Sequence, residues 1–90
     1  MEGDFHYSGA VDVAGLIYGN VYGKEMIILD TGSVKGNVNV SKLTINGHVE
    51  GQITADEISL GSNSVIKGDI LFKSHLKTEE GAEIDGYIKG

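Results

Sequence analysis

Apolar residues alternate with other residues in short stretches along the whole chain. One recurring unit is Val or Ile, any residue, Gly, any residue, Val or Ile, and it occupies residues 17–21, 34–38, 49–53, 66–70 and 84–88. A truncated copy, Gly3-Asp4-Phe5, opens the chain. Between the copies lies a second apolar pair: Val11/Val13, Met26/Ile28, Leu43/Ile45, Ile58/Leu60 and, in a weaker form, Leu76/Thr78. Apolar side chains on every second residue predict extended strands with one buried face.

The central glycines define the length of the repeat. They are Gly3, Gly19, Gly36, Gly51, Gly68 and Gly86, so successive copies lie 16, 17, 15, 17 and 18 residues apart. A unit of this size is much shorter than a propeller blade, which needs about 40 residues. It fits one coil of a parallel β-helix, in which each coil pairs with the coils on both sides. We expect the glycines at a strand interior or at a corner, where a side chain would crowd the chain or forbid its dihedral angles.

Turn length absorbs the variation in the repeat. Ala14-Gly15 and Asn46-Gly47 predict short turns, whereas residues 30–33, 61–64 and 79–83 predict longer ones. The segment from Ile70 to Leu76 has one residue more than the matching stretch of the middle repeats, which predicts a β-bulge. Left-handed solenoids usually keep a strict six-residue register, and parallel crossovers are right-handed in about 98 % of cases. We therefore predict an all-β chain: a right-handed parallel β-helix of about six coils, one domain over residues 1–90, without end caps.

Composition and charge narrow the possible partners. Thirteen acidic residues against seven Lys give a net charge of −6, which would repel the phosphate backbone of a nucleic acid. The chain has no Cys, and hence no disulfide or thiolate-metal scaffold. No apolar run approaches the roughly 20 residues that span a bilayer, and the N-terminus lacks the features of a signal peptide. We expect an intracellular, cytoplasmic protein that binds no nucleic acid.

Candidate chemistry is sparse. His6, His48 and His75 are separated by 42 and 27 residues, so they fall at different phases of the coil and are expected on the solvated surface. The acidic pairs at 56–57 and 79–80 have no long loops beside them to form a groove, and they are expected to be solubilising charges. We expect no catalytic residue, no metal site and no cofactor, and the chain is not predicted to be an enzyme.

The two ends of such a β-helix are the predicted interaction sites. An uncapped terminal coil leaves backbone groups and stacked apolar side chains without a neighbour on one side. Phe5, Val11 and Val13 are expected near one end, and Ile84 and Ile88 near the other. We predict that these residues join copies end to end, with the polarity of the resulting filament left open.

The ordered series of glycine-centred copies, with Gly68-Asp69-Ile70 late in the chain and Glu79-Glu80-Gly81-Ala82 in the following turn, resembles the bactofilins over essentially the whole sequence. The resemblance implies a right-handed, triangular β-helix that polymerises without nucleotide into bacterial filaments. Members act as cytoskeletal scaffolds for cell shape, cell-wall synthesis or motility. By this resemblance the partners are further copies of the chain and other scaffolded proteins, and the location is the cytoskeleton, reached at the inner face of the membrane through partners. The chain has no Pro and few residues before its first copy, so direct membrane attachment is not expected.

Two other classes of function compete with a scaffold. A left-handed hexapeptide-type acyltransferase would need a strict six-residue period, which the coil lengths contradict. A ligand-binding solenoid would need one flat face of repeated Thr or aromatic residues. The outward positions one residue before each glycine do not provide it, because they hold Tyr18, Lys35, Glu50, Lys67 and Asp85.

Overall fold

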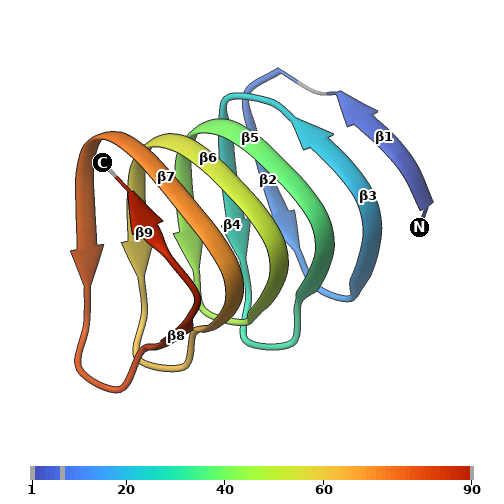
Figure 1. The fold of residues 1–90 in the computed structure, drawn as a ribbon. Helices are drawn as coiled ribbons and strands as arrows, with labels where there is room; N and C mark the ends of the chain where they lie inside the picture. Colours follow the sequence, from blue (N-terminus) through green and yellow to red (C-terminus); the bar gives the residue numbers. More distant parts are fainter. Residues whose placement is uncertain (1, 7, 90) are drawn as a thin grey trace.

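The chain forms a single stack of parallel strands in a computed structural model, which describes residues 2–6 and 8–89. Within these residues there is no helix, and every strand pairing is parallel. The strands, labelled in Figure 1, are β1 (Glu2–His6), β2 (Ala10–Val13), β3 (Leu16–Tyr22), β4 (Glu25–Ile28), β5 (Ser33–Ile45), β6 (His48–Leu60), β7 (Val65–Thr78), β8 (Glu83–Asp85) and β9 (Ile88–Lys89).

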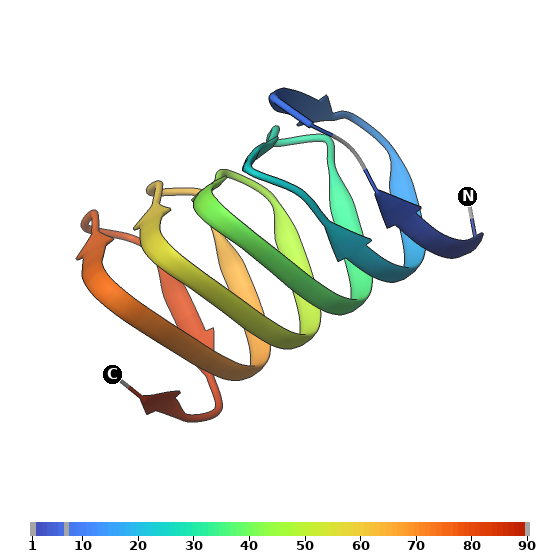
Figure 2. The same ribbon diagram turned by 90° about the horizontal axis from the view of Figure 1, so that it is seen from above.

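Each coil contains two strand segments and a closing turn. The first side of the solenoid is formed by β1, β3, the first halves of β5, β6 and β7, and finally β8 and β9. The second side is formed by β2, β4 and the second halves of β5, β6 and β7. The structure thus has five complete coils and the first side of a sixth, which confirms the predicted β-helix. Followed from blue to red in Figures 1 and 2, the coils wind with a right hand and the two termini lie at opposite ends.

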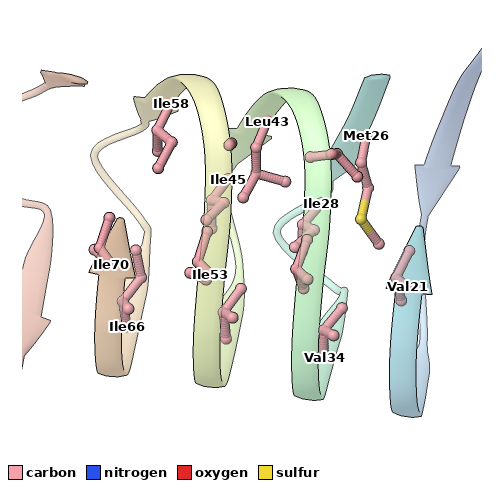
Figure 3. Close-up of a cluster of buried hydrophobic side chains, with 14 of the residues drawn as sticks. Val21, Met26, Ile28, Val34, Leu43, Ile45, Ile53, Ile58, Ile66 and Ile70 are labelled. Carbon is pink, nitrogen blue, oxygen red and sulfur yellow. The ribbon is translucent and has the colours of Figure 1, made fainter. Parts of the chain in front are cut away.

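The alternating apolar positions fill the interior. In each side, residues of the same phase lie directly above one another, and we call such a set a column. One column runs from Val11 through Met26, Leu43 and Ile58 to Leu76. Members in the middle coils are fully buried, and Figure 3 shows side chains of this and the neighbouring columns directed between the ribbons into the interior. Burial of this apolar surface is the main stabilising contribution to the fold.

Turns and one bulge accommodate the unequal coil lengths. The three longer turns each close with a backbone hydrogen bond, in which Gly32, Ser64 and Ala82 donate their N–H to the carbonyl oxygen three residues earlier. In β7 the register against β6 shifts, because Ala55 pairs with Phe72 while Glu57 pairs with His75. One extra residue of β7 therefore lies opposite Asp56, which confirms the predicted bulge.

Five of the six repeat glycines lie within strands, and Gly86 lies between β8 and β9. Gly3, Gly19, Gly36, Gly51 and Gly68 form one column on the first side, and a Cβ on Gly86 would point at the backbone of Gly68. All six have φ between 115° and 145°, a region that is essentially restricted to glycine. Of the two placements left open by the sequence, the strand is observed for Gly3, Gly19, Gly36, Gly51 and Gly68.

Among the residues described, no helix has the length and apolar character needed to cross a membrane.

Candidate self-assembly surfaces

The N-terminal end of the solenoid exposes part of its apolar interior. It is bounded by β1 on the first side and by β2 on the second. Phe5 is half-buried and Val11 is 36 % exposed, whereas Val13 is only 5 % exposed. Phe5 and Val11 therefore offer surface to a second molecule, while Val13 is already covered within its own chain and has little surface to contribute.

A hollow opens at this same end. It has a volume of about 480 Å³, and its walls include Phe5, Val11, Val13, Ile17, Val21 and Met26. Two carboxylates, Asp4 and Asp12, stand at the same hollow. The arrangement is an apolar recess with acidic groups beside it.

The C-terminal end exposes apolar side chains on the first side. Ile84 in β8 is half-buried, and Ile88 in β9 is 45 % exposed. Tyr87, which lies between these strands, has the largest exposed fraction of the large hydrophobic side chains described, 81 %. β9 pairs with β7 through Ile70–Ile88, so Ile88 continues a column whose inner members are buried.

The structure adds two residues to the C-terminal end that sequence reasoning missed. On the second side, β7 is the last strand described, and Phe72 and Leu76 at its edge are half-buried while packing against the core. The sequence reasoning assumed a complete sixth coil, which would cover Phe72 and Leu76. In the structure the sixth coil has only its first side, formed by β8 and β9, so the second side of β7 lies at the end. The pair Leu76/Thr78 has no successor in the sequence, and this was the available signal.

The three histidines lie in different columns and on different strands. His6 stacks on the Tyr22 ring, with ring centroids 4.8 Å apart, and His75 Nδ1 lies 3.7 Å from a Glu57 carboxylate oxygen. His48 is exposed at the start of β6. Over residues 2–6 and 8–89, no group of three His, Cys, Asp or Glu side chains is placed to hold a metal ion.

A right-handed stack of coils with apolar side chains exposed at both ends is a shape suited to self-association. The family model for the bactofilins, described as polymer-forming and cytoskeletal, matches residues 1–89. The chain belongs to the bactofilin family. No match was found among the curated proteins or among the solved structures.

Membership of the bactofilin family confirms the resemblance inferred from the repeats. A polymer-forming cytoskeletal family has a structural role, and the chain is therefore a self-associating filament protein. The right-handed winding, together with unequal coil lengths, removes the left-handed acyltransferase alternative.

Proposed function

We propose that the chain self-assembles end to end, without nucleotide, into filaments that act as a scaffold for cell shape, cell-wall or motility machinery. Residues 1–90 act as one β-helical unit, and the outer surfaces of the filament recruit the scaffolded proteins. The filament belongs to the cytoskeleton in the cytoplasm, and partners bring it to the inner face of the membrane.

The difference in burial along single columns is the observation that carries end-to-end contact. Ile70 is 1 % exposed and its neighbour Ile88 is 45 % exposed; Met26 is 1 % exposed and its neighbour Val11 is 36 % exposed. The inner members of each pair are covered by coils on both sides, and the outer members by a coil on one side. A second copy at either end would supply the missing coil, at a gain of about 25 cal/mol for each Å² of apolar surface buried.

Assembly without nucleotide is supported by the environment of the glycines. A phosphate-binding loop needs backbone N–H groups that are free to meet an anion. Gly19, Gly36 and Gly51 are instead strand residues, and a Cβ on each would meet the backbone of the preceding glycine, so nothing as large as a phosphate fits against them.

Negative-stain electron microscopy of the purified chain, without nucleotide or divalent ion, tests this function. We expect filaments from the wild-type chain and their loss or shortening in Phe5→Arg and Ile88→Arg. Asn39→Arg is the matched control, because it adds the same charge at an exposed position of a middle coil. Far-UV circular dichroism establishes that each variant keeps its β-structure. A wild-type chain that stays dispersed, or filaments unchanged in both end variants, would contradict the proposal.

A further inference from the structure

The outer surface of the second side carries a column of alternating charge. The column consists of Glu25, Lys42, Glu57 and His75, one from each of four successive coils. All four side chains are exposed. Because adjacent strands lie about 4.8 Å apart, the sign of the charge changes from Glu25 to Lys42 and again from Lys42 to Glu57 along the solenoid axis.

A similar column on the first side contains one ion pair within the chain. Lys35 Nζ lies 3.5 Å from Glu50 Oε2 and 5.7 Å from the centroid of the Tyr18 ring. On the second side, Glu57 Oε1 lies 3.7 Å from His75 Nδ1. Among the residues that the structure describes, no ion pair engages Lys42. Lys42 is thus an exposed cation that forms no ion pair within residues 2–6 and 8–89, at the middle of a molecule whose net charge is −6.

A shallow groove runs beside this column. Its volume is about 570 Å³. Its walls are formed by Gly9, Ser41 and Ser74 and by the charged residues Lys24, Glu25, Lys42, Asp56 and Glu57. The glycine and the two serines are small, which leaves space for a long side chain from another molecule. Asp56 and Glu57 together present two carboxylates at the level of one coil, next to the lysine of the preceding coil.

We propose that this column joins two antiparallel copies of the chain side by side. With a two-fold axis between Lys42 and Glu57, Lys42 of each copy enters the groove of the other and faces its Asp56 and Glu57. The contact is isologous, since the same surface serves both copies. In this arrangement Glu25 of each copy also faces His75 of the other.

This lateral contact rests on the proposed function, because it acts between filaments. A single exposed ion pair contributes little, but filaments repeat the contact at every subunit and so add up many weak contacts. The net negative charges of two neighbouring filaments repel one another across distances set by the thickness of the molecule, whose smallest extent is 20 Å. At physiological ionic strength the Debye length is about 8 Å, so this repulsion is largely screened while the close pairs persist.

The salt dependence of bundling follows from the different ranges of the repulsion between filaments and of the ion pairs at the contact. We expect paired or bundled filaments near 0.15 M salt. At about 0.01 M the Debye length grows to roughly 30 Å and repulsion separates the filaments, whereas at about 1 M it shrinks to roughly 3 Å and the ion pairs are lost.

Charge-reversal variants test the contact. K42E and E57K each place like charges against one another in a bundle of a single variant, so neither is expected to bundle. A mixture of K42E filaments and E57K filaments carrying different fluorophores is expected to co-bundle, since positions 42 and 57 then carry opposite charges in both contacts across the two-fold axis. K67E and E50K make the same charge changes on the first side and are the matched controls, which are expected to bundle like the wild-type chain.

Filament length is scored separately from bundling, which distinguishes failure of the lateral contact from failure of end-to-end assembly. If the chain does not polymerise, sedimentation equilibrium of K42E mixed with E57K at high concentration measures the same contact between single molecules, and a heterodimer is expected. Absence of mixed bundles and of the heterodimer would overturn the proposal. Loss of bundling in K67E and E50K to the same degree as in K42E and E57K would also overturn it, because net charge alone would then account for bundling.

Discussion

A Cβ atom on Gly51 would overlap the carbonyl oxygen of Gly36, the residue directly beside it in the preceding coil. The same relationship joins Gly19 to Gly3 and Gly36 to Gly19. Gly19, Gly36 and Gly51 thus each have two reasons to be glycine: a positive φ and a backbone neighbour in the space that a side chain would need. The spacing of the copies along the sequence is a direct consequence of this stacking.

Gly51→Ala is expected to destabilise the chain by roughly 3 kcal/mol or more, because a strained dihedral angle and steric overlap add together. Gly3→Ala separates the two effects. Gly3 has a φ of 115° in the same column, but no atom lies within 4 Å of the position that its Cβ would occupy. We expect a loss of about 1 to 2 kcal/mol for Gly3→Ala. Denaturant unfolding of assembly-deficient chains measures both, and equal losses would show that overlap contributes nothing.

Truncation of two isoleucines of one column should separate folding from assembly. Ile53 is 1 % exposed in the middle of the solenoid, and Ile53→Ala is expected to cost about 2 to 5 kcal/mol of stability. Ile88 is 45 % exposed at the end of that column, so Ile88→Ala is expected to cost the single molecule less than about 1 kcal/mol. Filament yield by sedimentation should nevertheless fall in Ile88→Ala. A chain in which Ile88→Ala unfolds as readily as Ile53→Ala would refute this division.

The regular part of the fold could be predicted from the sequence because each interior column repeats one kind of residue, either apolar residues or glycine. The period of two placed Met26, Leu43 and Ile58 inward, and the one extra residue after Ile70 predicted the bulge that β7 shows opposite Asp56. The glycine column was recognised, but its position in the strand was not, since positive φ occurs at corners as well as in strands.

The end surfaces could be predicted only in part. Burial at an end depends on which neighbouring strand is present on each side, and the sequence order alone does not show this. Val13 is covered although it lies in the first coil, whereas Phe72 and Leu76 belong to an end although their repeat is not the last. The charge column of Lys42 and Glu57 was also not foreseen, because it depends on the register of adjacent coils.

Ser64 is a buried polar residue whose contribution can be measured in isolation. Its side chain is fully buried, and its Oγ donates a hydrogen bond of 2.7 Å to the Gly61 carbonyl oxygen. Ser64→Ala is expected to cost about 0.5 to 1.5 kcal/mol, since that oxygen also accepts the backbone N–H of Ser64 and keeps a partner. Ser62→Ala, at an exposed position of the same turn, should change stability by less than about 0.5 kcal/mol. Equal effects in thermal unfolding would assign the loss to the turn backbone.

The second side of the C-terminal end provides a test of how much of the terminal coil takes part in assembly. Leu76 packs against the core from the last strand of that side, and Leu76→Arg would place a charge in any contact that covers the edge of β7. We expect filaments to shorten at least as much as in Ile88→Arg, because an unpaired charge buried in an interface is strongly unfavourable. Lys77→Arg is the control, since it keeps both the charge and the exposed position next in the strand. Filament lengths by electron microscopy decide the question: normal filaments in Leu76→Arg, alongside their loss in Ile88→Arg, would confine the end contact to the first side, formed there by β8 and β9.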